Sequence, residues 1–315
     1  MRYYFAPLEG LTDSIYRRLH HTYFGGVDRY YTPFLSPTVH RALTAREKQE
    51  LPQADTLGFC VIPQLLTKNA DDFLWMAAIC GDLGYEEINL NAGCPSGTVT
   101  AKGKGSGLLR DVDTLDCFLN SIFSKAALPI SVKTRIGYES PEEFADILAV
   151  YNRYPIKELT VHPRVRKVFY NGPVDMDCFR YAVKNSNAPV CYNGSLCTRE
   201  QIREFSNSYP QIDAIMLGRG LIANPGLLTD KGTTAQVLEQ FHDALLAEYT
   251  RAFGSSRNAM FRMKENWRHW LCLFEDSHKL GKRLRKATDE YEYKAIAREI
   301  FRTLTISDNV TPDWD

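Results

Sequence analysis

The sequence predicts an α/β fold: a (β/α)8 barrel, or TIM barrel, followed by a C-terminal all-helical domain. Three observations support this prediction. Short apolar segments recur at intervals of about 30 residues, the length of one strand, one helix and two loops. Eight of these segments lie before residue 232, with amphipathic stretches between them. After residue 232 the β pattern stops, and only helical periodicity remains.

The predicted strands share short runs of apolar residues and lie at 3–6, 29–32, 59–64, 87–91, 130–134, 158–162, 190–193 and 214–217. The predicted helices between them include 70–83, 114–125, 141–152 and 199–206. Alternating strands and helices favour a parallel sheet with right-handed crossovers, and eight units are typical of a barrel. A doubly wound open sheet is the alternative fold.

The C-terminal part has helical periodicity at 235–253, 257–274 and 289–304. We therefore divide the chain into a catalytic barrel domain at 1–232 and a helical domain at 233–315.

Composition excludes several classes of protein. The 38 Lys and Arg residues equal the 38 Asp and Glu residues, so the overall field of the chain cannot hold a nucleic acid or a membrane. No apolar run is long enough to span a bilayer, and the N-terminus lacks the apolar segment of a secretory signal. The eight cysteines show neither CxxC pairs nor zinc-like spacing. We expect a cytoplasmic protein with reduced thiols, no metal site and no membrane contact.

Polar residues follow the predicted strands repeatedly, at the end where barrel enzymes carry their active sites. Lys133 lies among apolar neighbours, and a cation in a barrel interior needs an anionic partner. The negatively charged edge of a reduced flavin would supply one, and the Gln64 amide could bind the same edge. The alternative is that Lys133 points outward to solvent. Cys94 lies in a Gly/Pro-rich turn, where its thiol could donate a proton to a substrate carbon or act as a nucleophile.

Two glycine-containing turns indicate a phosphate site. Asn193-Gly194 follows the seventh predicted strand, and Gly218-Arg219-Gly220 follows the eighth and leads into a short predicted helix at 221–224. Backbone N–H groups in such turns bind phosphate in many barrels. The alternative is that these glycines only permit tight turns.

With these residues in place, the chain resembles the tRNA-dihydrouridine synthases. The motifs that carry the resemblance are Ala6-Pro7-Leu8-Glu9-Gly10, Asn89-Leu90-Asn91-Ala92-Gly93-Cys94-Pro95-Ser96, Gly105-Ser106-Gly107, Val132-Lys133-Thr134-Arg135, Val161-His162-Pro163-Arg164, Asn193-Gly194 and Gly218-Arg219-Gly220. The chain departs from the family pattern at Leu8, Pro163 and Ser195, where the family commonly has Met, Gly and an acidic residue.

The resemblance implies an FMN-dependent enzyme that uses NADPH to reduce uridine in tRNA to 5,6-dihydrouridine. It implies that Cys94 is the general acid that protonates the uracil ring. It implies that FMN is bound by Pro7, Leu8, Gln64, Lys133, His162, Asn193, Gly194, Gly218 and Arg219. It also implies that Asn91, Arg135 and Tyr170 contact the base, which must leave its stack to reach the barrel.

The helical tail contains a basic segment. Residues 257–286 hold nine Lys and Arg residues and three acidic ones, a local excess of +6. Since basic side chains neutralise phosphates, we expect Arg262, Lys264 and Arg268 to contact tRNA. Trp267 and Trp270 are expected to pack in the core. We expect a monomer. The alternatives are a barrel that acts on a small free pyrimidine, similar to dihydroorotate dehydrogenase, and an RNA-binding module that has lost catalysis.

Overall fold

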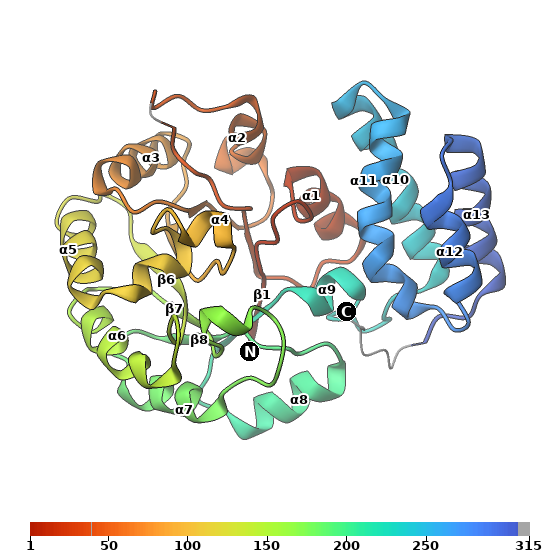
Figure 1. Cartoon of the computed structure of the whole chain (residues 1–315). Coiled ribbons are helices and arrows are strands. Elements are labelled where there is room, and N and C mark those ends of the chain that lie inside the picture. Colours follow the sequence, from red (N-terminus) through yellow and green to blue (C-terminus); the bar gives the residue numbers. More distant parts are fainter. Residues whose placement is uncertain (39, 308–315) are drawn as a thin grey trace. The chain divides into compact units, whose positions relative to one another are not determined.

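The computed structural model describes residues 1–38 and 40–307, which form two compact units (Figure 1). The first unit consists of residues 1–7, 28–194 and 209–216. The second consists of residues 8–27, 195–208 and 217 onward. The second unit therefore contains the predicted helical tail together with three segments from earlier in the chain.

A parallel sheet of nine strands forms the barrel. The strands are β1 (Arg2–Phe5), β2 (Arg29–Tyr31), β3 (Val61–Ile62), β4 (Gln64–Leu65), β5 (Ile88–Ala92), β6 (Ile130–Arg135), β7 (Leu159–His162), β8 (Val190–Tyr192) and β9 (Ala214–Leu217). Their order is β3-β2-β1-β9-β8-β7-β6-β5-β4, so both edges of the sheet are formed by neighbouring stretches of the chain. The predicted barrel is confirmed.

The ninth strand arises because Pro63 divides the predicted strand 59–64. Proline has no N–H to donate to a neighbouring strand. The part before Pro63, β3, pairs with β2, and the part after it, β4, pairs with β5. The two short strands therefore occupy one position of an eight-unit barrel.

Helices of the first unit flank the strands (Figure 1). They are α2 (Ala45–Glu50), α3 (Ala70–Asp82), α4 (Gly97–Thr100), α5 (Val112–Phe123), α6 (Phe144–Tyr151) and α7 (Met176–Asn185). Side-chain caps set their first residues. Asn69 caps α3, and Asp111 caps α5 and starts it two residues before the predicted position.

The second unit consists of helices. They are α1 (Ser14–Tyr23), α8 (Arg199–Ser208), α9 (Arg219–Ala223), α10 (Ala235–Phe253), α11 (Ser256–Trp270), α12 (His278–Lys286) and α13 (Glu290–Thr303). The three predicted tail helices are present, and α12 was not predicted. Trp267 and Trp270 are fully buried, as expected. No helix in the described ranges is both long and apolar enough to cross a bilayer.

Candidate active site

Strand register brings the predicted polar residues together inside the barrel. Asn89 lies opposite Ser131, Asn91 opposite Lys133, and Arg135 opposite His162. Because alternate residues of a strand share one face, Ser131, Lys133 and Arg135 all lie on the same side of β6. The Asn89 amide donates to the Ser131 hydroxyl (2.9 Å), so this side is the polar interior.

A chain of side-chain amides crosses this interior. Asn91 Nδ2 donates to Gln64 Oε1 (2.7 Å), and Gln64 Nε2 donates to Asn89 Oδ1 (2.8 Å). Gln64 and Asn89 are fully buried, and Asn91 is 7 % exposed. These bonds fix the orientation of each amide, and in them Asn91 and Gln64 each use only one of their two N–H donors. The predicted contacts of Gln64 with flavin and of Asn91 with uracil stay predictions.

Asn91 also holds the loop that carries Cys94. Its Oδ1 accepts from the backbone N–H groups of Gly93 (3.0 Å) and Cys94 (2.9 Å). Cys94 therefore lies just after β5, in a loop whose backbone is held by Asn91 of that strand. Cys94 is partly exposed, in contrast to the buried Cys80 and Cys191.

The three successive carbonyls of residues 93–95 are held as well. Arg135 Nε donates to Gly93 O (2.9 Å), and Ser106 Oγ donates to Cys94 O (2.8 Å). Arg166 Nε donates to Pro95 O (3.2 Å). Gly105 has a positive φ of +59°, and an added Cβ would lie 2.9 Å from the Cβ of Cys94. The Gly105-Ser106 motif is thus required for close packing against the Cys94 loop.

Lys133 and Arg135 are the two cations of the β6 interior face. Burial, and secondarily the Arg135 charge, lowers the pKa of Lys133 to about 8. Burial also lowers the pKa of Arg135 to about 10. Arg135 donates to Gly93 O and to Val165 O (3.0 Å), whereas the Lys133 ammonium forms no hydrogen bond or ion pair with any described residue. An anionic cofactor edge would complement Lys133, so the residues present fit the predicted flavin.

The loop after β7 contains His162, Arg164 and Tyr170. Arg164 Nη1 lies 3.0 Å from His162 Nε2, and since a guanidinium only donates, Nε2 is the acceptor and the ring proton is on Nδ1. Tyr170 stacks on His162 with ring centroids 6.0 Å apart, and the Arg135 guanidinium lies 5.3 Å from the Tyr170 ring. Tyr170 is 45 % exposed and the preceding Phe169 is 41 % exposed, so two aromatic side chains of this loop remain open to solvent.

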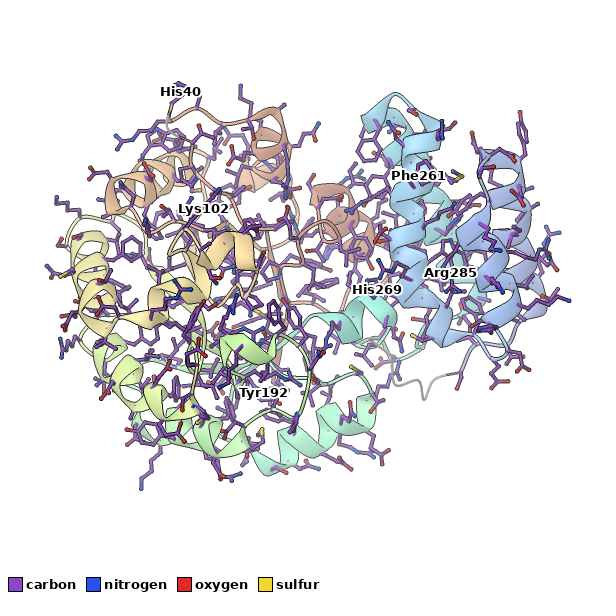
Figure 2. All side chains as sticks on the ribbon, in the orientation of Figure 1. His40, Lys102, Tyr192, Phe261, His269 and Arg285 are labelled. Atoms are coloured by element: carbon purple, nitrogen blue, oxygen red, sulfur yellow. The ribbon has the colours of Figure 1, made fainter. Side chains whose placement is uncertain are left out.

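Asn193 and Gly194 lie at the end of β8. Asn193 Nδ2 donates to Met216 O (2.7 Å), which ties the end of β8 to β9. A Cβ on Gly194 would lie 1.9 Å from the hydroxyl of Tyr192, a residue labelled in Figure 2, so no other residue fits there without rearrangement. This close approach is an independent reason for glycine, and the predicted phosphate contact stays a prediction.

The remaining predicted cofactor residues lie near unit boundaries. Pro7 ends the first segment of the first unit, and Leu8 begins the second unit, where its N–H donates to Thr12 Oγ1 (2.9 Å). Gly218 and Arg219 start α9 in the second unit. Arg219 Nη2 donates to the hydroxyl of Ser195 (2.9 Å), so the residue that departs from the family pattern orients this guanidinium.

The three predicted tRNA contacts of α11 have different surroundings. Arg262 is mostly buried and pairs with Asp13 (2.7 Å). Lys264 Nζ donates to the carbonyls of Arg285 (3.2 Å) and Ala287, at the end of α12. Arg268 is exposed and pairs with Glu265 at 3.4 Å, an interaction of low energy at a surface. Of the three, Arg268 has the side chain open to a partner in solution.

The unpredicted helix α12 adds a basic face. Its buried residues are Leu280, Gly281 and Leu284. Its exposed cations are Lys279, Lys282, Arg283, Arg285 and Lys286, and Figure 2 labels Arg285 within this unit. The spacing of the two leucines could have revealed this helix, but its short length and high charge gave a weak periodic signal.

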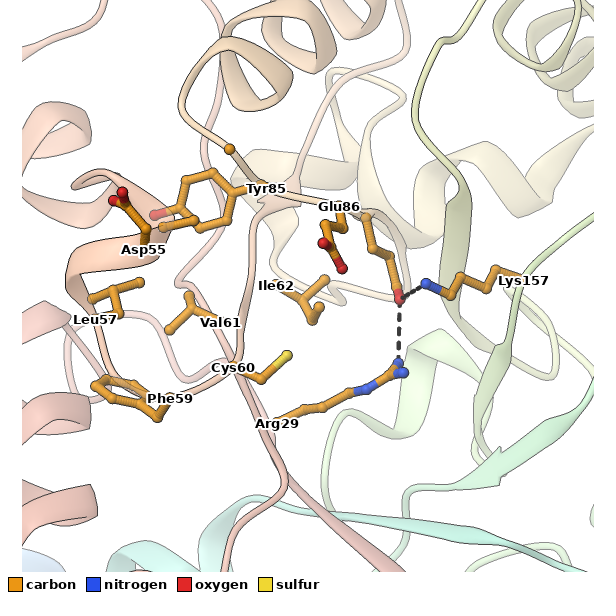
Figure 3. Close-up of a pocket in the computed structure, with 13 residues that line it drawn as sticks. Arg29, Asp55, Leu57, Phe59, Cys60, Val61, Ile62, Tyr85, Glu86 and Lys157 are labelled. Carbon is orange, nitrogen blue, oxygen red and sulfur yellow. Dashed lines mark hydrogen bonds and ion pairs between the residues drawn. The ribbon is translucent and has the colours of Figure 1, made fainter.

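A pocket of about 410 Å³ lies at the opposite end of the strands, where β2, β3 and β5 begin (Figure 3). Glu87 there accepts from Lys157 Nζ (2.9 Å) and Arg29 Nη1 (3.2 Å). The lining includes none of the predicted site residues. Since this end of a barrel carries stabilising contacts, we assign the ion pairs to stability.

The parallel barrel and the polar side chains at the carboxyl ends of its strands are typical of the barrel enzymes. An old yellow enzyme homologue from Zymomonas mobilis has a similar structure, with a TM-score of 0.53 and 12% sequence identity over 72% of this chain and 86% of that chain. At this identity the likeness supports the fold alone.

The family model described as dihydrouridine synthase (Dus) matches residues 4–309, and the chain belongs to that family. It is 28% identical to tRNA-dihydrouridine synthase B of Pasteurella multocida (strain Pm70), over 72% of this chain and 67% of that protein. It is 29% identical to the Proteus vulgaris protein of the same name, over 71% and 69%. The resemblance inferred from the motifs is confirmed: the protein is a flavin-dependent oxidoreductase that reduces uridine in tRNA to dihydrouridine.

Proposed function

We propose that Cys94 is the general acid of this reaction, with FMN as the flavin and NADPH as the reductant. When bound, reduced FMN supplies the hydride that adds to C6 of the uracil ring. The Cys94 thiol donates its proton to C5, so that one hydride and one proton convert uracil to 5,6-dihydrouracil. The proposal rests on one observation: a partly exposed thiol is held on an anchored loop beside the interior face that carries Lys133.

Lys133 and Gln64 are proposed to bind the polar edge of the flavin. The Lys133 ammonium complements a negative charge there, and the Gln64 amide is already oriented by its bonds to Asn89 and Asn91. We propose that His162 contacts the flavin as well, and that Pro7 and Leu8 line the ring system. The phosphate would be bound by Asn193, Gly194, Gly218 and Arg219.

For the substrate, we propose that Asn91 binds the uracil edge and that Tyr170 contacts the extruded base. Arg135 would act mainly by holding the loops on either side of the base, since its guanidinium donates to the carbonyls of Gly93 and Val165. An exposed aromatic ring is well suited to stack on an unpaired base.

We further propose that residues 1–232 carry catalysis and residues 233–315 bind tRNA. The exposed cations of α12 together with Arg268 form the proposed binding surface, which we call the α12 face. Lys264 would support this face from within, because its ammonium donates to a carbonyl at the end of α12, whereas Arg262 would hold α11 against the start of α1 through Asp13. We propose that the enzyme works as a monomer in the cytoplasm, where its tRNA substrate is available.

The acid role is tested with Cys94→Ala in the flavin-loaded protein. We expect at least about a 100-fold loss of dihydrouridine formation on an unmodified tRNA transcript, because a positioned general acid contributes about that much. Flavin absorbance and the rate of flavin reduction by NADPH should be unchanged. The control is Cys117→Ala, which removes an exposed thiol of α5. Equal single-turnover rates in Cys94→Ala and wild type would refute the role.

A further inference from the structure

Arg166 holds the Cys94 loop from outside. Its Nε donates to Pro95 O (3.2 Å), and its Nη2 donates to the Thr100 hydroxyl (3.3 Å). One guanidinium thus binds the residue directly after Cys94 and the last residue of α4. The segment that leads away from the thiol is clamped at both of these points.

The remaining contacts of Arg166 are aromatic. Its guanidinium lies 5.1 Å from the ring centroid of Tyr138 and 5.2 Å from that of Phe169. No carboxylate in the described part of the chain pairs with it. The two hydrogen bonds start from Nε and Nη2, whose relative positions are fixed by the planar guanidinium. A lysine ammonium has no such pair of fixed donor nitrogens.

Arg166 belongs to the same loop as Tyr170. Its backbone N–H donates to Gly137 O (2.9 Å), and the next residues form a short 3-10 helix at Arg166–Val168. Phe169 follows with a φ of +51°, a conformation that side-chain-bearing residues rarely adopt. The loop is therefore tightly held where it passes from Arg166 to Tyr170.

We propose that Arg166 is a positioning residue for the proton donor: it fixes the Cys94 thiol relative to the loop that carries Tyr170. This inference rests on the proposed function, in which Cys94 protonates the base and Tyr170 contacts it. Arg135 joins the same two segments from the other side of Cys94, through Gly93 O and Val165 O. The thiol lies between two arginine bridges, so proton donor and base-binding loop form one rigid unit.

The expected consequence is kinetic. Proton transfer requires a donor within hydrogen-bond reach of the carbon, and a misplacement of about 1 Å can reduce the rate on the order of 100-fold. Removal of Arg166 would leave Cys94 N–H and O bonded to Asn91 and Ser106, but would release Pro95 O. The thiol would remain present but less well placed.

The test compares Arg166→Gln with Arg166→Lys and with the control Lys167→Gln in flavin-loaded, full-length protein. Lys167 is an exposed cation on the same loop, so its variant removes the same charge without releasing the Cys94 loop. Three quantities are measured: kcat and KM for tRNA, the rate of flavin reduction by NADPH, and the rate of Cys94 alkylation by iodoacetamide. Peptide mass spectrometry separates Cys94 from the exposed Cys60 and Cys117.

For Arg166→Gln we expect kcat to fall about 10- to 100-fold, with KM for tRNA and the rate of flavin reduction little changed. Alkylation of Cys94 should become several-fold faster because its loop is looser. Arg166→Lys, which keeps the charge but replaces two separate donor nitrogens by one, should give intermediate values, and Lys167→Gln should match wild type.

Three results would overturn the inference. These are a kcat equal to that of Lys167→Gln, a rise in KM alone, which would indicate an RNA contact, and a parallel loss of flavin reduction, which would indicate general misfolding. If wild type itself forms no dihydrouridine, the proposed function fails. The alkylation comparison then still decides whether Arg166 holds the loop, and equal alkylation rates would refute it.

Discussion

Lys133 differs from two other partly buried cations, Arg262 and Arg29, in how its charge is compensated. Arg262 pairs with Asp13, and Arg29 pairs with Glu87. Lys133 has no carboxylate partner among the described residues, and burial lowers its pKa to about 8. The protein therefore carries an unfavourable interior charge that a bound anion would stabilise, which links its local energetics to flavin binding.

Lys133→Met is expected to have opposite effects on flavin affinity and on stability. Flavin affinity should fall at least about tenfold, because one charge-assisted interaction is removed. The melting temperature of the flavin-free protein at pH 7 should rise by a few degrees, because the desolvated charge is gone. Absorbance titration and thermal unfolding measure the two effects. Lys102→Met, at an exposed lysine, is the control, and a lower melting temperature in Lys133→Met alone would contradict the prediction.

The same residue predicts a pH dependence of stability. The unfolded lysine has a pKa of 10.5 and the folded one about 8. Between these values the unfolded chain binds more protons, so the free energy of unfolding from this group rises with pH from about 8 to 10.5. Below pH 8 the full penalty is present. In urea unfolding of the flavin-free protein, the difference between wild type and Lys133→Met should therefore shrink from pH 7 to pH 9.5.

At the scale of elements, α12 shows how a short helix can be formed mainly by packing. Leu280 and Leu284 are buried, and the end of the helix is held by Lys264 Nζ, which donates to carbonyls there. Nine residues of such high charge would be a marginal helix in isolation. Packing of the buried leucines therefore stabilises the helix, and the helix in turn places its cations on the exposed side.

The α12 face predicts a salt-dependent weakening of tRNA binding. Lys279→Gln combined with Lys286→Gln should reduce the slope of log affinity against log salt by about one for each phosphate that is no longer neutralised. The matched control is Lys125→Gln with Lys184→Gln, two exposed lysines at the ends of the barrel helices α5 and α7. Filter binding at several salt concentrations gives both slopes. Equal slopes in the two double variants would rule out the α12 face.

At the scale of the whole molecule, the C-terminal helices depend on earlier parts of the chain. Tyr16 and Phe24, at α1, contact Phe241 of α10 edge-to-face, with ring centroids 5.3 and 5.2 Å apart. Tyr249 of α10 donates to Asp13, the cap of α1, at 3.1 Å. The second unit therefore forms its core from residues separated by more than two hundred positions.

We accordingly predict that residues 233–315 alone do not fold cooperatively. Without α1, the fragment would expose Phe241 and leave Arg262 without Asp13, at a cost of several kcal/mol. Circular dichroism and thermal melting of the fragment, with the full chain as the reference, provide the measurement. A sharp transition with native helical content would show that the tail is autonomous.

The sequence was enough to predict the barrel and the family, whereas the site residues that it indicates stay predictions. Strand spacing and alternation are local properties of the chain, and they predicted every strand position except the division at Pro63. The motifs that contain Cys94 and Lys133 were enough to recognise the family, because residue types and their order are read directly from the chain. Helix starts were less well predicted, since a cap such as Asp111 acts two residues before the periodic pattern begins.

How these residues are held, and which charges are open to a partner, depends on contacts between distant parts of the chain. Arg262 and Arg268 look alike in the sequence, yet one is bound to Asp13 and the other is exposed. The role of Arg166 could not be predicted from the sequence, because its partners Pro95 and Thr100 are about seventy residues away. Pattern and composition report on neighbours along the chain, whereas compensation of a charge and positioning of a thiol depend on neighbours in space.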